Sequence, residues 1–161
     1  LRFWRERLDK YRCKRNNEIK TKAEKEFAMI IREYTTPDMN EIMNLYASVG
    51  WTNYTDHPDM LRAAYAHSLC TLAAYEDERL VGAVRAVGDG ASIVFIQDIL
   101  VLPDYHRRGV GTALLRAMME RYSAVYQMEL LTDDTEKTTA FYESLGFVRV
   151  EKWGCCAFVR G

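Results

Sequence analysis

Apolar and polar residues in the first half of the chain follow patterns that predict one strand, two helices and a hairpin. Residues 29–34, MIIREY, are typical of a short strand. Thr36 and Pro37 favour the start of a helix, and apolar residues then recur at helical spacing until Gly50. A second helix is predicted at 61–68. Two runs, 70–76 and 79–87, flank a two-residue turn and predict a hairpin.

The second half alternates between predicted strands and helices. The run IVFIQDILVL at 93–102 is almost continuously apolar, as expected of a strand buried on both faces. Apolar residues four positions apart then predict an amphipathic helix over 110–122. A strand at 128–132 precedes a helix over 133–146, where Asp133 and Glu136 resemble a capping box and Gly146 supplies the stop.

The residues after this last helix predict two closing strands, at 147–153 and 155–160. Strands thus pair first by a hairpin and later alternate with helices. This order predicts the α/β fold class, with a central mixed sheet that carries helices on both faces.

Composition and charge narrow the possible classes of function. The 161 residues suffice for one domain, and 48% hydrophobic with 28% charged residues is an ordinary globular composition. The net charge of −1 argues against a nucleic-acid partner. No apolar run reaches membrane-spanning length, so we expect no membrane partner.

Residues 1–28 differ from the remainder, because they hold ten basic and five acidic residues and so carry a net charge of +5. They lack the apolar core of a signal peptide. We therefore predict a basic N-terminal extension at 1–28, helical or poorly ordered, and a compact domain at 29–161.

Cysteines and histidines give no metal or disulfide signature. The spacing includes no Cys-x-x-Cys pair, so reduced thiols and a cytoplasmic location are predicted. The three histidines do not have the spacing of metal ligands, and no metal is expected. These residues are Cys13, Cys70, Cys155, Cys156, His57, His67 and His106.

A glycine-rich loop, HRRGVG at 106–111, separates the long apolar strand from the amphipathic helix. A helix N-terminus presents unpaired N–H groups, and glycines let an anion approach them, so this arrangement suits a pyrophosphate. It lacks the lysine of a Walker loop. Leu114 also stands where a dinucleotide fingerprint has a third glycine or alanine.

Two motifs around this loop resemble those of the GNAT superfamily of acyl-CoA-dependent N-acyltransferases. ILVLP precedes HRRGVG, and the later segment TTAFYESLGF resembles the second signature of the family. The resemblance covers residues 29 to about 159. His106 replaces the usual glutamine or arginine, and Thr135 replaces the asparagine of many members.

The resemblance implies the GNAT fold, with acetyl-CoA as co-substrate in a gap between two splayed parallel strands. Backbone contacts to its pantetheine arm are implied for Ile99, Leu100 and Val101, and a weaker contact for Thr135. The pyrophosphate would lie against the glycine loop, formed by His106, Arg107, Arg108, Gly109, Val110, Gly111 and Thr112.

Acetyl transfer to an amine requires a base for the ammonium proton and an acid for the leaving thiolate. The resemblance implies Tyr142 as the acid, although it could instead only pack on the cofactor. Asp98, a lone carboxylate in an apolar strand, is a candidate base or a structural carboxylate. Other candidate bases are Asp133, Asp134, Glu129 and His57.

The acceptor pocket is predicted to include the loop at 50–60, where Trp51 and Tyr54 could stack on a flat or cationic substrate. The segment DGASIVFIQDILVLP also resembles serotonin N-acetyltransferases, which implies an aralkylamine or small polyamine acceptor. A protein N-acetyltransferase and a non-catalytic acetyl-CoA sensor stay open as alternatives. The oligomeric state is open too, with a homodimer as one option.

Overall fold

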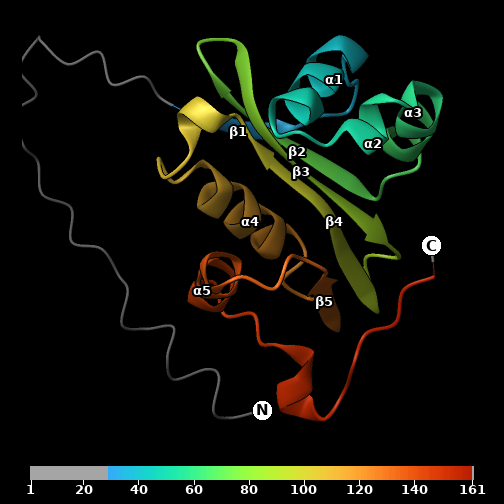
Figure 1. Cartoon of the computed structure of the whole chain (residues 1–161), viewed down its shortest axis with the longest axis vertical. Coiled ribbons are helices and arrows are strands. Elements are labelled where there is room, and N and C mark those ends of the chain that lie inside the picture. Colours follow the sequence, from blue (N-terminus) through green and yellow to red (C-terminus); the bar gives the residue numbers. More distant parts are fainter. Residues whose placement is uncertain (1–28, 161) are drawn as a thin grey trace, which may run out of the picture.

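The computed structural model describes residues 29–160, which fold around a single five-stranded sheet (Figure 1). The basic extension predicted at 1–28 lies outside the described residues. Neighbouring strands are antiparallel from the first to the fourth, and the fifth is parallel to the fourth, which confirms a mixed sheet. In spatial order the strands are β1 (Ile30–Glu33), β2 (Cys70–Glu76), β3 (Arg79–Gly88), β4 (Ile93–Val101) and β5 (Gln127–Leu130).

Helices cover both faces of this sheet, as predicted (Figure 1). One face carries α1 (Met39–Ser48), α2 (Thr52–Thr55) and α3 (Pro58–Ala66). The other carries α4 (Val110–Arg121) and α5 (Glu136–Ser144). Each face has its own apolar cluster, and the fully buried side chains include Ile42, Leu45, Tyr46 and Leu61 on one side and Leu114, Leu115 and Met118 on the other.

Two helices begin at residues other than those predicted. The cap of α1 is Asp38, not Thr36, because the Asp38 carboxylate accepts the N–H of Asn40 at 2.7 Å. The cap of α5 is Thr135, whose hydroxyl accepts the N–H of Thr138 at 3.2 Å. The Thr138 hydroxyl in turn accepts the N–H of Thr135, so this pair forms the capping box predicted for Asp133 and Glu136.

A bulge interrupts the pairing of β3 with β4. Arg85 pairs with Asp98, but Ala86 pairs with Ile96, so Gln97 has no partner on β3. The extra residue changes the alternation of side chains along β4, so that side chains after the bulge point to the opposite face of the sheet from the one that the alternation before it would give. Ile96 packs in the cluster beneath α4, whereas Leu100, an even number of positions later, packs in the cluster beneath α1.

The strands β4 and β5 separate just after this bulge. Their parallel pairing ends at Ile96 and Leu130, while β4 continues to Val101. Among residues 29–160, the edge of β4 that faces β5 therefore has no strand partner beyond Ile96. This is the splayed gap that the resemblance implied.

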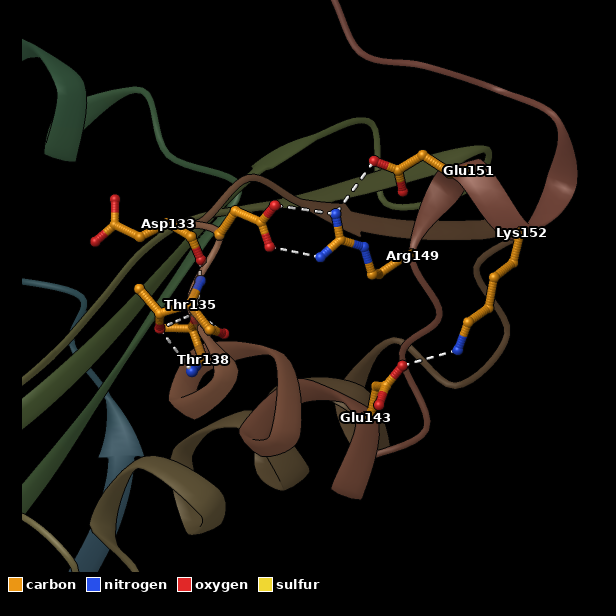
Figure 2. Close-up of polar contacts among 8 residues, drawn as sticks. Asp133, Thr135, Thr138, Glu143, Arg149, Glu151 and Lys152 are labelled. Carbon is orange, nitrogen blue, oxygen red and sulfur yellow. Dashed lines mark hydrogen bonds and ion pairs between the residues drawn. The ribbon is translucent and has the colours of Figure 1, made fainter.

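The prediction of two closing strands at 147–153 and 155–160 was wrong, since no strand follows β5 in the described residues. Residues Val150–Trp153 form a 3₁₀ turn, η3. Arg149 binds the Asp134 carboxylate through both terminal nitrogens, at 2.5 and 3.2 Å, and Lys152 binds Glu143 at 2.9 Å. These ion pairs hold the segment against α5 and the loop before it (Figure 2).

Candidate active site

A cavity of about 560 Å³ opens where β4 and β5 diverge. Its floor is the C-terminal half of β4, and its sides are the glycine loop with the start of α4, the loop after β5, and α5. Val49 and Trp51, between α1 and α2, close the remaining side. A volume of this size accommodates a small-molecule ligand or cofactor.

The strand edge of β4 forms a row of cavity-lining residues, which includes Ile99, Leu100 and Val101. Since β5 has ended, this edge is open to an extended ligand that pairs with it as another strand would. His106 also lines the cavity, and its Nε2 lies 2.8 Å from the carbonyl oxygen of Val101. The imidazole can donate a hydrogen bond there and fix the end of the strand relative to the loop.

The N-terminus of α4 supplies an anion site beside this edge. Gly109 is the cap residue, in the left-handed region at φ +82°, and Arg107 is also left-handed at φ +59°. In the described structure, Ala113 is the first residue of this helix whose backbone N–H donates to a backbone carbonyl, which is that of Gly109 at 2.9 Å. The amides of the preceding turn, at residues that line the cavity, are thus available to a phosphate.

Nine of the eleven predicted cofactor residues line the cavity, and Arg108 and Thr135 do not. The Arg108 guanidinium binds Glu76 at 2.8 Å and lies over the Tyr105 ring, 4.5 Å from its centroid. The left-handed turn at Arg107 separates the two arginines, so that only Arg107 lines the cavity. The Thr135 hydroxyl is engaged in the cap of α5.

Tyr142, the predicted acid, lines the cavity from α5. Its ring packs edge-on against Phe141 and Phe147, with centroids 5.0 and 5.9 Å away. Burial raises the pKa of the Tyr142 phenol, and a hydrogen bond with Thr132 opposes this shift. The phenol therefore keeps its proton at neutral pH, as a proton donor must.

Asp98, the candidate base, does not line the cavity. Its side chain is 1% exposed, and Oδ2 accepts hydrogen bonds from Arg85 Nε at 2.5 Å and from the Tyr46 hydroxyl at 2.7 Å. Its role as a base stays a prediction, and these contacts favour the structural alternative. Among the other candidates, Asp133 lines the cavity, and Glu129 and His57 do not.

The two adjacent aspartates before α5 have different surroundings. Asp134 is held by Arg149, which lowers the pKa of its carboxyl group through hydrogen bonding and charge. Figure 2 shows the Asp133 side chain pointing away from that ion pair. The Asp133 backbone carbonyl accepts a bond from the Thr138 hydroxyl, which ties the loop to α5.

Residues 36–147 match the family model described as the Acetyltransferase (GNAT) family, which is more than half of the chain. The chain belongs to the GNAT family of acetyltransferases. An acetyltransferase, GNAT family protein, from Streptococcus pneumoniae TIGR4 is 36% identical in sequence. Its solved structure has a TM-score of 0.76, over 83% of this chain and 97% of that one.

Two more distant GNAT proteins are also similar. An uncharacterized N-acetyltransferase ycf52-like of Prochlorococcus marinus is 24% identical over 83% of this chain and 75% of its own. The aminoglycoside N-acetyltransferase AAC(6')-Iy, solved in complex with CoA, shares the fold at 22% identity. Its TM-score is 0.65 over 83% of this chain and 95% of that one. The finer resemblance to serotonin N-acetyltransferases stays a prediction.

Sequence patterns missed several residues of this GNAT site. Gln97, Thr132 and Lys137 line the cavity but were not predicted as site residues. Gln97 reaches the cavity through the bulge. Lys137, in the first turn of α5, adds a second cation to the lining, and only the position of α5 relative to β4 brings it to the site.

Trp51 lines the cavity as predicted, whereas Tyr54 does not. Tyr54 stacks behind Trp51, with ring centroids 5.8 Å apart. Within residues 29–160, no cluster of His, Cys, Asp and Glu could hold a metal ion. None of the helices in that range is long and apolar enough to cross a membrane.

Proposed function

We propose that this GNAT protein transfers the acetyl group of acetyl-CoA to the primary amine of a small molecule, such as an aralkylamine or a polyamine. The observation that carries the proposal is a single cavity that joins an open strand edge, a helix N-terminus and the half-buried phenol of Tyr142. These three features match the pantetheine arm, the pyrophosphate and the leaving thiolate of acetyl-CoA in turn.

The cofactor would be held mainly by backbone groups. The amides of Gly109, Val110 and Gly111 would bind the pyrophosphate, because they begin a helix and have no partners within it. Arg107 and Lys137 line the same cavity and would add positive charge. The amide groups of the pantetheine arm would pair with the edge of β4.

The chemical step would place the acetyl carbonyl near β4 and Tyr142. The neutral amine nitrogen attacks the thioester carbon, and the resulting oxyanion accepts hydrogen bonds from backbone N–H groups of β4. The C–S bond then breaks as the Tyr142 phenol donates its proton to the sulfur. Before the attack, a base takes the ammonium proton of the substrate, with Asp98 and Asp133 as the candidates. As the amide forms, the nitrogen releases a second proton to solvent.

The cavity wall near Trp51 supports an acceptor with an apolar or aromatic part. Val49, Trp51 and Leu131 line the cavity and offer apolar surface. Asp133, on the loop after β5, would attract the positive charge of an amine substrate. An apolar body with one or more ammonium groups fits both features.

The experiment that tests this function mixes the purified chain with acetyl-CoA and a panel of aralkylamines, polyamines, aminoglycosides and lysine peptides. We expect release of free thiol that depends on an aralkylamine or polyamine, with acetylated product identified by mass spectrometry. Thiol release with lysine peptides alone would contradict the small-molecule assignment. Tight CoA binding without turnover on any amine would favour the sensor alternative.

The cytoplasmic location and the homodimer are also proposals for this chain. Light scattering of the purified protein measures the oligomeric state. Fractionation of the source cells with an antibody against the chain measures its location. A monomer in the first experiment, or an organelle fraction in the second, would overturn the corresponding proposal.

A further inference from the structure

A buried group of charged and phenolic side chains lies beside the cavity without lining it. The Arg85 and Asp98 side chains are 5% and 1% exposed, and their ion pair measures 2.5 Å. The Tyr46 hydroxyl donates to the same carboxylate oxygen, Oδ2, at 2.7 Å, and the Tyr65 hydroxyl lies 3.5 Å from that of Tyr46. A buried polar group of this kind is unfavourable unless its members stay paired.

The ion pair lies at the bulge that shapes the floor of the cavity. Arg85 and Asp98 are directly paired across β3 and β4, and the register changes at the next position. Gln97, which precedes Asp98, and Ile99, which follows it, both line the cavity. The ion pair thus fastens β4 to β3 between two residues that face the substrate.

Tyr46 connects the same carboxylate to the opposite wall of the cavity. It lies on α1, and its ring packs against Trp51 and Tyr54 with centroids 5.9 and 5.1 Å away. Trp51 lines the cavity. A single buried carboxylate on the strand that would hold the cofactor is therefore connected, through Tyr46, to the aromatic group that would hold the acceptor.

Charge balance favours a fixed ion pair over a proton acceptor. Burial lowers the pKa of Arg85, but the charges of Asp98 and Tyr46 and the hydrogen bonds to them together outweigh burial and leave the pKa raised. Protonation of Asp98 would leave a buried guanidinium without its counterion. The second oxygen, Oδ1, is buried and has no hydrogen-bond partner among the described residues, and Asp98 does not line the cavity.

We propose that Asp98, Arg85 and Tyr46 are positioning residues, which hold the β4 bulge and the Trp51 wall in register, and that Asp98 does not accept the substrate proton. The proposal rests on the acetyltransferase function proposed above. It assigns Arg85 and Tyr46 a role in the reaction that no sequence motif indicates. Asp98 acts through the strand on which the acetyl group would lie.

Two variants separate positioning from proton transfer. Tyr46→Phe removes one hydroxyl and keeps the ring. The double variant Arg85→Met with Asp98→Leu removes both charges together, because replacing a whole buried ion pair by apolar residues is tolerated better than removing one partner. The matched control is Tyr34→Phe, since the Tyr34 hydroxyl donates to Glu41 at 2.7 Å elsewhere along α1.

The expected results differ between the two variants. For Tyr46→Phe we expect a raised amine KM, because the lost hydrogen bond to Asp98 is the contact that fixes Tyr46, and through its ring the Trp51 wall, relative to β4. For the double variant we expect kcat to fall about tenfold or more and CoA binding to weaken, because misplacement of the reacting groups by even about 1 Å has effects of this size. The control should stay within about twofold of the parent chain in both constants.

The pH profile decides between the two roles. Positioning predicts that the folded double variant keeps the acidic limb of kcat/KM, at a lower overall level. Loss of that limb would show that Asp98 is the base and would overturn the proposal. Circular dichroism and thermal unfolding establish that each variant is folded; if the double variant is not, Tyr46→Phe alone decides, and an unchanged amine KM overturns the proposal.

CoA binding, measured by calorimetry without amine, keeps this proposal separate from the proposed function. If the parent chain acetylates no amine, the proposed function fails. The positioning role is then judged from the CoA affinity of the double variant. Weakened binding supports it, and an affinity equal to that of the parent chain overturns it.

Discussion

The Tyr142 phenol is the single residue whose chemistry the cavity most directly exposes. It lines the cavity, and burial raises its pKa, so it is protonated at neutral pH. For Tyr142→Phe we expect kcat to fall about 10²-fold, the usual size of general acid catalysis, because the ring stays and the proton is lost. Steady-state kinetics with acetyl-CoA and the best amine of the panel measures this effect.

Tyr122→Phe is the control for this substitution, because Tyr122 does not line the cavity. CoA affinity should be nearly unchanged in both variants. A Tyr142→Phe protein that loses CoA affinity while keeping kcat would instead show that the ring only packs on the cofactor.

A second single-residue substitution, at Gly109, tests the anion site. Its φ of +82° is strained for any residue with a Cβ, although nothing lies within 4 Å of the position that a Cβ would take. Gly109→Ala should therefore reshape the loop, at a loss of about 1–2 kcal/mol in the free energy of unfolding. We expect a large rise in the KM for acetyl-CoA and loss of the thermal stabilisation that CoA gives.

Gly154→Ala provides the matched control for Gly109→Ala. Gly154 has a similar φ of +73° and similarly open surroundings, but it lies after η3 and does not line the cavity. A similar loss of stability without a change in CoA binding is expected. Equal CoA affinity in both variants would contradict the pyrophosphate assignment.

At the scale of elements, the contact of α4 with β3 determines how closely the helix approaches the strand edge. A Cβ at Gly82 would lie 2.9 Å from the Leu100 carbonyl oxygen and 3.1 Å from Val110 Cγ1. Both of these residues line the cavity. The missing side chain at Gly82 thus lets β4 and α4 approach each other closely enough to form one site.

For Gly82→Ala we expect a loss of about 1–3 kcal/mol in the free energy of unfolding, because backbone atoms of β4 must move. CoA affinity should fall with it, since the strand edge and the helix are displaced together. Urea unfolding and calorimetry measure the two effects. Gly111→Ala is the control for stability, because its Cβ would meet only ordinary contacts, the nearest at 3.5 Å; a larger loss there would contradict this account.

At the scale of the whole molecule, surface carboxylates make the stability of the fold depend on pH. Hydrogen bonds from Ser92 and from three backbone amides lower the pKa of Asp89, and Arg149 and Lys152 lower the pKa values of Asp134 and Glu143. A carboxyl group whose pKa is lower in the folded state than in the unfolded state stabilises the fold when the pH is above its ordinary, unfolded-state pKa. This stabilisation is lost as the pH falls from the ordinary pKa towards the folded-state pKa.

We therefore expect the melting temperature to fall as pH decreases below the ordinary aspartate value of 3.8. Asp89→Asn should make this dependence shallower, because one of the groups that bind protons on unfolding is removed. Thermal unfolding followed by circular dichroism across a pH series measures both slopes. Identical slopes in the two proteins would show that the Asp89 turn does not contribute.

The order of the elements follows from the sequence alone. Period-two, helical and continuously apolar patterns correctly predicted β1 to β5, the long helices and the helices on both faces, because each pattern reflects which residues of a local segment are buried. The glycine loop was predicted as an anion site because a helix N-terminus presents unpaired N–H groups and glycines let an anion approach them. The family motifs led to ten of the residues that line the cavity, nine predicted for the cofactor and Tyr142.

Tertiary structure decided the rest, because these features depend on contacts between distant segments. The apolar run of β4 hides its bulge, since inserting one residue changes the facing of side chains but not their apolar character. Asp98 meets Arg85 and Tyr46 only when α1 packs on the sheet. The C-terminal residues alternate like a strand, yet ion pairs with Asp134 and Glu143 hold them beside α5, because a strand needs a partner that local sequence does not specify.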